Sequence, residues 1–369
     1  MKRALLTLSL LISALASPIL ASAQDKKPVE KKDIILPDTT CVYAIKGTDT
    51  LRMDIYYPKR EKILNICPMP GPISKAIQAT PVSQPKEIVY RQTTGPLTHY
   101  NGKEKPTILY IFGGGFAVGE KDAILQLRWY KKYVENGFRI IAIDYRLGLK
   151  DINNEHINKL KIVKKLKGSL DMAVEDLYTA TNFLIEHGKE LGIDPNNLVI
   201  SGASAGAMTS LQADYELCNR DKFNVPLPEG FRYKGVISFS GGVTSKEGKP
   251  DYRTGTPAPT LLFHGIDDRI VNYKQLRFFH LGFFGSDKLA KRLEKYQTNY
   301  RIYRYQDCGH EVAASFNPTV AEQFDFIYDN VMEGKKKVID ATLDDPGIDA
   351  RFKVKKYKDI YQMTDNSNK

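Results

Sequence analysis

The sequence predicts an α/β fold, with a mostly parallel central sheet and helices on both of its faces. Continuous apolar runs of the buried-strand type alternate along the chain with segments of helical periodicity. The chain has 369 residues, of which 42% are hydrophobic, and we find no internal repeat. It is long enough for one large α/β domain with a sizeable core.

The individual elements follow from these patterns in order. Two strands flank a Gly-Thr-Asp turn at 47–49, and the runs TILYIF and FRIIAIDY predict the next two strands. Gly137 ends the first helix, and apolar residues near one face mark the second. The predicted strands span residues 40–46, 51–57, 107–112, 138–145, 197–201, 233–239, 260–264 and 300–305. The predicted helices span 123–136, 169–191, 205–217, 289–296 and 319–331.

Residues 1–23 have the pattern of a secretory signal peptide. Lys2 and Arg3 precede an apolar run at 4–16, and small residues stand where a signal peptidase would cut. We therefore expect cleavage near Ala23-Gln24 and a secreted or periplasmic mature protein. An uncleaved membrane anchor is the alternative. No second long apolar run predicts an integral membrane span in the mature protein.

The rest of the chain divides at polar and proline-rich segments. Residues 24–333 are predicted to form the α/β domain. Within it, residues 58–105 contain several prolines and little periodicity, which indicates a long irregular insertion. Residues 334–369 are predicted to form a polar C-terminal tail that has no clear place in the core.

The composition and charge exclude several classes of protein. A chain with 26% charged residues and ordinary Gly and Pro content is neither disordered nor collagen-like, and it is not a multi-span membrane protein. The net charge is +11, with basic clusters at 159–167, 335–337 and 353–358. We interpret these clusters as solvated faces and tails, with contact to an anionic envelope or an acidic polysaccharide as the alternative. An exported protein is not expected to bind nucleic acid.

The four cysteines, Cys41, Cys67, Cys218 and Cys308, are too few for a disulfide scaffold and lack paired C-x-x-C zinc spacing. An oxidising compartment would permit disulfides. Four cysteines allow three pairings, among which the sequence does not choose, and buried thiols are an equal alternative.

The first motif with chemical meaning is Gly202-Ala203-Ser204-Ala205-Gly206, between a predicted strand and a predicted helix. G-x-S-x-G in this context is the nucleophile elbow, a turn that strains the serine backbone and requires small neighbours. The helix that follows directs its N-terminus at the serine and favours negative charge that develops there. Ser204 is therefore the predicted nucleophile, and an ordinary Gly-Ser loop is the alternative.

A second motif, Gly113-Gly114-Gly115-Phe116, follows the strand at 107–112. Three successive glycines allow backbone N–H groups to face a ligand without obstruction by a Cβ atom. We expect them to form an oxyanion hole together with the N–H of Ala205. A flexible turn or a phosphate-binding loop is the alternative, but no G-x-x-x-x-G-K-[ST] motif is present.

The loops after two later strands carry an acid and a base. Asp267 and Asp268 follow the strand at 260–264, and only one of these neighbours is expected to reach the site. His310 follows the strand at 300–305 and is the best-placed general base among the six histidines. His264 ends a strand, and we expect it to pack under the acid loop. The order Ser, Asp, His makes coincidence unlikely.

Together these motifs resemble the α/β-hydrolase superfamily, in particular its carboxylesterase and hormone-sensitive-lipase-like branches, from about residue 40 to 331. The resemblance implies that Asp268 is the acid and that Gly114, Gly115 and Ala205 form the oxyanion hole. The motifs are Phe112-Gly-Gly-Gly-Phe116, Asp144-Tyr145-Arg146, Glu175-Asp176 with Gly192-Ile193-Asp194-Pro195, Gly202-Ala-Ser-Ala-Gly206, His264-Gly-x-x-Asp268-x-x-Val271 and Gly309-His310-Glu311.

Two features depart from the family pattern. The family often has His where this chain has Phe112, and a phenylalanine side chain cannot make the hydrogen bond that fixes the glycine loop. We expect packing to hold the loop instead. Residues 147–168 are longer than the usual family connection, so that with residues 58–105 they are a possible lid near the active site.

The predicted function is a secreted serine esterase that hydrolyses carboxylic esters of short acyl chains through an acyl-enzyme. The substrate is a small-molecule or carbohydrate ester, with acetyl or feruloyl groups as candidates, and no metal or organic cofactor is required. A serine exopeptidase of the same fold and an inactive binding protein on this fold are the alternatives. The sequence does not indicate the oligomeric state.

Overall fold

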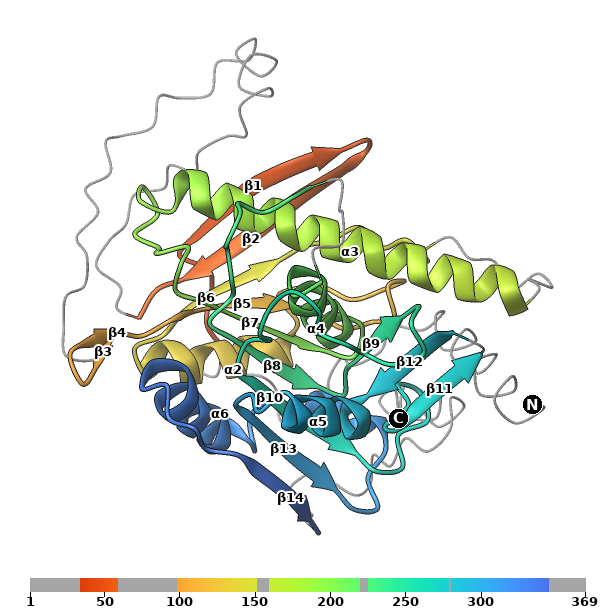
Figure 1. Cartoon of the computed structure of the whole chain (residues 1–369). Helices are drawn as coiled ribbons and strands as arrows, with labels where there is room; N and C mark the ends of the chain where they lie inside the picture. The colour runs from red at the N-terminus through yellow and green to blue at the C-terminus, as the bar shows by residue number, and fades with distance from the viewer. Residues whose placement is uncertain (1–33, 59–97, 151–158, 220–224, 279, 345–369) are drawn as a thin grey trace, which may run out of the picture.

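A nine-stranded sheet forms the centre of the protein (Figure 1), in the order β1-β2-β6-β5-β7-β8-β10-β13-β14. The computed structural model describes residues 34–58, 98–150, 159–219, 225–278 and 280–344. The signal-peptide prediction for residues 1–23 lies outside these residues, as does most of the insertion predicted at 58–105. The sheet consists of β1 (Thr39–Lys46), β2 (Asp49–Tyr56), β5 (Thr107–Ile111), β6 (Arg139–Ile143), β7 (Leu198–Ala203), β8 (Gly235–Phe239), β10 (Thr260–Gly265), β13 (Tyr300–Tyr305) and β14 (Ile339–Leu343).

Strand direction confirms the predicted sheet. β1 pairs antiparallel with β2, and β2 pairs antiparallel with β6, whereas all pairs from β6 to β14 are parallel. Every residue of β5, β6, β7, β8, β10 and β13 is buried. Parallel strands covered on both faces need apolar residues at consecutive positions, which is why most of these segments are apolar runs in the sequence. β13 is different, since it also buries Arg301 and Arg304.

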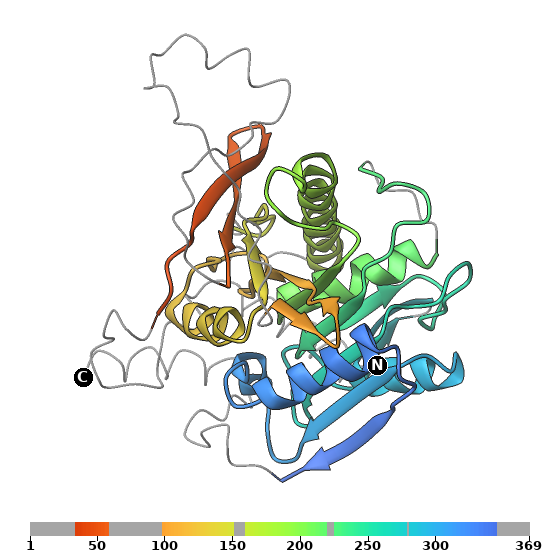
Figure 2. The same ribbon diagram turned by 90° about the vertical axis from the view of Figure 1, so that its left-hand side faces the viewer.

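Helices cover both faces of the sheet (Figure 2), with α2 and α6 on one side and α3, α4 and α5 on the other. Their bounds are α2 (Ile124–Glu135), α3 (Lys159–His187), α4 (Ala205–Leu217), α5 (Ser286–Lys295) and α6 (Val320–Phe326). The π-helical turn η6 (Ile327–Met332) continues α6. Gln323 joins the first pair of helices, because its side-chain oxygen accepts hydrogen bonds from Trp129 at 2.9 Å and from Tyr133 at 2.7 Å.

An aromatic layer fills the space between α2 and the sheet and also supports the histidine loop. Phe316 follows the short 3₁₀ helix η5 (His310–Ala314), and its ring lies 4.7 Å from Phe239 of β8 and 5.3 Å from Trp129 of α2. All three rings are fully buried. Aromatic packing of this kind fixes the loop that carries His310 against the rigid centre of the molecule.

The structure corrects the predicted start of the long helix. α3 begins at Lys159, ten residues before the predicted position, so the second half of the segment 147–168 is helical. Figure 1 shows these first turns of α3 extending past the ends of the strands. Lys164 and Lys165 are exposed here, and Lys167 is half-buried. Leu160, Val163 and Leu166 recur there at helical spacing, but the lysines between them and Gly168 obscured the helical start.

Two smaller sheets were not predicted. β9 (Gly242–Ser245), β11 (Gln275–Phe278) and β12 (Leu281–Gly285) form a three-stranded antiparallel sheet in the order β11-β12-β9. Gln212 of α4 covers the free edge of β9, because its side-chain oxygen accepts the backbone N–H of Thr244 at 2.8 Å. β3 (His99–Tyr100) and β4 (Lys103–Glu104) form a hairpin within the segment 58–105.

The predicted C-terminal tail is wrong for residues 339–343, which form β14 in parallel with β13. The strand alternates half-buried apolar residues, Ile339, Ala341 and Leu343, with exposed polar ones. Such alternation is typical of a strand with one covered face. The sequence around it is strongly polar and basic, and a five-residue alternation was too short to indicate a strand in that setting.

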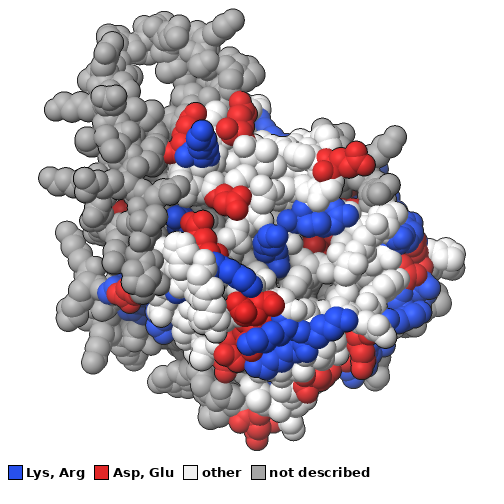
Figure 3. All heavy atoms as spheres, turned by 60° about the vertical axis from the view of Figure 1, so that its left-hand side comes forward, with Lys and Arg blue, Asp and Glu red and all other residues white. Residues whose placement is uncertain are grey.

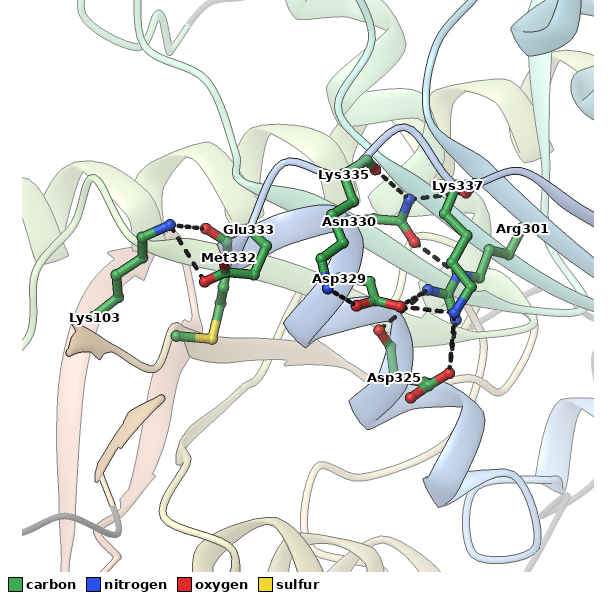
Figure 4. Close-up of polar contacts among 9 residues, drawn as sticks. All are labelled: Lys103, Arg301, Asp325, Asp329, Asn330, Met332, Glu333, Lys335 and Lys337. Carbon is green, nitrogen blue, oxygen red and sulfur yellow. Dashed lines mark hydrogen bonds and ion pairs between the residues drawn. The ribbon is translucent and has the colours of Figure 1, made fainter. Parts of the chain in front are cut away.

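Figure 4 shows how the chain is held between η6 and β14. The Arg301 guanidinium of β13 is fully buried and donates to the Asn330 side-chain oxygen at 2.6 Å. The Asn330 amide nitrogen in turn donates to the backbone carbonyls of Lys335, at 3.1 Å, and Lys337, at 2.9 Å. Asn330 therefore connects the sheet to the turn that begins the last strand.

Charges of both signs lie side by side on the face shown in Figure 3. Lys335 and Lys337, which belong to one of the basic clusters, both form ion pairs with Asp329. Two of the three lysines of this cluster therefore have an acidic partner within the protein. In the part of the chain that the structure describes, no helix is both long enough and apolar enough to cross a membrane.

The cysteines differ in state. Cys41 of β1 is disulfide-bonded, and its partner is not among the described residues. Cys218 and Cys308 are buried and carry thiols rather than disulfides. Burial raises the pKa of the Cys218 thiol well above its usual value, so this side chain stays neutral.

We predict that Asn330→Ala lowers the free energy of unfolding by about 2–4 kcal/mol, because it leaves a buried guanidinium N–H and two carbonyls without partners. Urea denaturation followed by circular dichroism would measure this change. Lys335→Ala is the matched control, since it removes only a solvent-exposed ion pair of the same cluster and should cost much less. Equal losses in the two variants would contradict the role given to Asn330.

Candidate active site

The carboxyl ends of β5, β7, β10 and β13 bring four predicted motifs to one edge of the sheet. The strand order places β5 beside β7, and β10 beside β13. Parallel strands end at the same edge, where ligands bind in open α/β sheets. The glycine loop, the elbow, the acid loop and the histidine loop therefore meet here.

The elbow has the strained geometry that the sequence predicts. Ser204 lies between β7 and α4 with φ 52° and ψ −116°, in the left-handed region of backbone space. Gly206 permits α4 to start close to β5, because a Cβ atom at this position would lie 2.0 Å from the carbonyl oxygen of Ile111. The elbow therefore holds Ser204 next to the loop that follows β5.

The structure brings Ser204, His310 and Asp268 together in one hydrogen-bonded chain. His310 Nε2 lies 2.9 Å from Ser204 Oγ, and His310 Nδ1 lies 2.8 Å from Asp268 Oδ2. All three side chains are buried. Asp268, rather than its neighbour Asp267, contacts the histidine. In this geometry His310 can accept the hydroxyl proton of Ser204, and the carboxylate of Asp268 faces the charged imidazole that results.

Asp268 is held by four groups. Its Oδ1 accepts the backbone N–H groups of Ile270 at 2.9 Å and Val271 at 3.0 Å, while its Oδ2 faces His310 and also His264 Nε2 at 3.3 Å. Burial alone would raise the pKa of Asp268. The charge of His310 and the hydrogen bonds from His264 and His310 outweigh burial and hold that pKa well below its usual range. Asp268 therefore remains ionised at neutral pH.

The opposite balance applies to the histidine. Burial by itself lowers the pKa of His310, but the charge and hydrogen bond of Asp268 and the charge of Glu311 together raise it above its usual value. Glu311 is itself fixed, since its carboxylate accepts the backbone N–H of Gly309 at 2.7 Å. The protonated form that would arise during proton transfer is thus stabilised where it forms.

His264 was expected to pack beneath the acid loop, and the structure places it there. It is fully buried, with Nδ1 2.7 Å from Ser286 Oγ and Nε2 2.9 Å from the carbonyl oxygen of Val271. The carbonyl contact requires that Nε2 carries the proton. The same N–H then faces the carboxylate of Asp268, a contact that only the folded acid loop creates.

The glycine loop lies against the elbow. Gly114 has φ 115°, and a Cβ atom there would lie 1.9 Å from the carbonyl oxygen of Val118, so only glycine fits. The turn is closed by the N–H groups of Ala117 and Val118, which both donate to the Gly114 carbonyl at 3.1 Å. Within the described residues, no acceptor is found for the backbone N–H groups of Gly114, Gly115 or Ala205. These donors are therefore available to a ligand.

The described residues include no group of three or more His, Cys, Asp and Glu side chains placed to hold a metal ion. The chemistry at this edge is that of a nucleophile, a base, an acid and a set of backbone donors.

Two family models match overlapping parts of the chain. The BD-FAE model matches residues 97–244, and the Phospholipase/Carboxylesterase model matches residues 172–323. The first match spans the glycine loop and the elbow, and the second spans the elbow, Asp268 and His310. The two matches thus cover all the motifs of the site.

Curated relatives match over shorter segments. Esterase LipI of Mycobacterium tuberculosis is 30% identical over 111 residues, which are 30% of this chain and 29% of that protein. Lipase 5 of Diutina rugosa is 27% identical over 157 residues, which are 42% of this chain and 23% of that protein. The aligned segments thus span less than a third of the length of these relatives.

Among solved structures, esterase 2 of Thermogutta terrifontis is similar to this chain, with a TM-score of 0.48 and 17% identity. The alignment covers 78% of this chain and 90% of that one. With its strand order, its strained serine elbow and the two family matches, the chain has the α/β-hydrolase fold and is similar to esterases and carboxylesterases.

Proposed function

We propose that this protein hydrolyses carboxylic esters through an acyl-enzyme on Ser204. The observation that carries the proposal is the buried chain of hydrogen bonds from Ser204 through His310 to Asp268, at a strained elbow beside the glycine loop. The matches to esterase and carboxylesterase families support ester substrates.

In the proposed mechanism, His310 takes the proton of Ser204 as the serine oxygen attacks the ester carbonyl. The N–H groups of Gly114, Gly115 and Ala205 stabilise the oxyanion, and the N-terminus of α4 adds favourable dipole charge. His310 then gives its proton to the leaving alcohol. A water molecule, deprotonated by His310, attacks the acyl-enzyme and releases the acid. Asp268 keeps the imidazole oriented and stabilises its charged form.

For the substrate, we propose short acyl groups, with acetyl or feruloyl groups on carbohydrate as the natural candidates. Among these candidates, the match to the BD-FAE family over residues 97–244 supports a feruloyl ester. The first described turns of α3 are rich in exposed lysine, which does not suit the apolar lid of a long-chain lipase.

We also propose that the protein is exported, with residues 1–23 as its signal peptide. The disulfide at Cys41 supports this proposal, because disulfides persist in oxidising compartments such as the periplasm and the cell exterior.

We predict that the mature protein hydrolyses chromogenic acetyl and butyryl esters and that Ser204→Ala abolishes this turnover. Release of the chromophore across a series of increasing acyl length would measure the chain-length preference. A folded wild-type protein that cleaves none of these esters would contradict the proposed function. Peptide substrates and then a binding role would be the next tests.

We predict that the rate constant kcat/KM falls as the pH drops through the pKa of His310, because only the neutral imidazole accepts the serine proton. Since that pKa is raised, the fall should begin above the ordinary histidine value of about 6.5. Asp268→Asn removes the charge that raises it, so the acid limb should move to lower pH, with a loss in kcat of about 10⁴-fold.

Asp267→Asn is the matched control for this measurement, because it neutralises the adjacent carboxylate, which does not contact His310. Its pH profile should follow that of the wild type. A profile of Asp268→Asn that keeps the wild-type acid limb would show that Asp268 does not set the histidine pKa.

We predict that the exported protein begins at Gln24. Expression of the full chain in a secreting host, followed by intact-mass spectrometry of the purified protein, would locate the new N-terminus. A mature protein that retains residues 1–23 would contradict cleavage and favour the uncleaved anchor.

A further inference from the structure

Two buried aromatic residues, Phe112 and Tyr145, hold the start of the glycine loop. Phe112 directly follows β5, and Tyr145 lies two residues after the end of the neighbouring strand β6. The Tyr145 hydroxyl donates to the backbone carbonyl of Phe112 at 3.0 Å. The two rings also pack together, with their centroids 4.4 Å apart and a tilt of 31°. Both residues are buried, so this contact is shielded from water.

The far end of the loop is tied to the same segment. Phe116 has φ 62°, which is unfavourable for a bulky side chain, and it is almost completely buried. The N–H of Leu149 donates to the Phe116 carbonyl at 2.9 Å, and the Phe116 ring meets Tyr145 edge-on at 6.3 Å. The segment after β6 therefore holds the loop at both of its ends.

Ion pairs next to Tyr145 fix its backbone. The neighbouring Arg146 donates its backbone N–H at 2.8 Å and its guanidinium at 2.7 Å to Asp176 of α3, a fully buried carboxylate. Lys46 of β1 forms a second ion pair with Asp176 at 3.0 Å. A bidentate arginine contact of this kind has little freedom to move, so the backbone that carries Tyr145 is anchored to a helix and an outer strand.

The Tyr145 hydroxyl is a permanent donor. Burial raises the pKa of Tyr145 well above that of an exposed phenol, so the group stays protonated at any pH at which the protein is folded. A histidine in the position of Phe112 would instead change its hydrogen bonds as it titrates.

We propose that Tyr145 and Phe112 act as a positioning pair that presents the N–H groups of Gly114 and Gly115 to the oxyanion. The phenol fixes the carbonyl at the start of the loop, and the packed rings restrict rotation of the glycines that follow. The inference rests on the proposed ester hydrolysis, because it concerns the same transition state.

The experiment compares Tyr145→Phe with the wild type in ester hydrolysis and in binding of a trifluoromethyl ketone, which forms a tetrahedral adduct with the serine. Loss of preorganised donors weakens the binding of the transition state more than the binding of the substrate in its ground state. We expect kcat to fall about 10–100-fold, which is part of the effect of losing one oxyanion donor. KM should stay within about threefold of wild type, and the affinity for the ketone should fall in step with kcat/KM.

Tyr57→Phe is the matched control, because the Tyr57 hydroxyl also donates, at 2.8 Å, to a backbone carbonyl of a buried residue, Leu191, near the opposite edge of the sheet. Its loss should leave kcat and ketone affinity close to wild type. A Tyr145→Phe variant that resembles Tyr57→Phe in both measurements would overturn the proposal. A wild type without ester turnover would instead refute the proposed function, so the two failures are distinguishable.

Phe112→Leu tests the other half of the pair and keeps the proposal testable if Tyr145→Phe folds poorly. It removes the ring contact but retains the backbone carbonyl that Tyr145 binds. We expect a smaller loss of kcat than in Tyr145→Phe, with ketone affinity falling in step. The double variant should lose less than the product of the two single losses, since both act through one loop. Unchanged kcat in Phe112→Leu, or fully multiplicative losses, would contradict a coupled pair.

Discussion

The close approach of α4 to the end of β5 is the constraint on which the site depends. Gly206 lets the first turn of the helix lie against the Ile111 carbonyl, where any side chain would collide. This contact fixes Ser204 in its strained conformation and places it beside the glycine loop. Close contact between the backbones of α4 and β5 therefore brings three features together. They are the helix dipole, the loop donors and the serine oxygen.

A buried carboxylate is the second constraint, because an isolated charge in the interior is strongly unfavourable. Asp268 meets this requirement with two backbone N–H donors from its own turn and with two histidines. Asp267 lies outside this turn of donors, although its residue type is identical. The turn, rather than the presence of an aspartate, thus decides which of the two adjacent carboxylates faces His310.

Local sequence features predicted the elbow with Ser204 and the loop with His310, because each lies directly after a recognisable strand. The choice of Asp268 over Asp267 came from the family resemblance. Contacts between segments far apart in the chain were not predictable in this way. The bond from Tyr145 to Phe112 exists because β5 and β6 are neighbours in the sheet. The early start of α3 lies in a segment whose few apolar residues are separated by lysines, and β14 is a short edge strand with only one covered face. Both lack the continuous burial that makes a pattern visible.

The last strand nevertheless belongs to the scaffold of the site. Asp340 of β14 forms an ion pair with Arg304 of β13, whose guanidinium also donates to the Tyr273 hydroxyl at 2.5 Å. The backbone N–H of Tyr273 donates at 3.3 Å to the carbonyl of Asp268, and its ring meets His264 edge-on. A continuous set of contacts therefore runs from the edge of the sheet to the acid loop. Because the arginine is mostly buried and binds partners on both sides, β14 restricts the movement of the loop that carries Asp268.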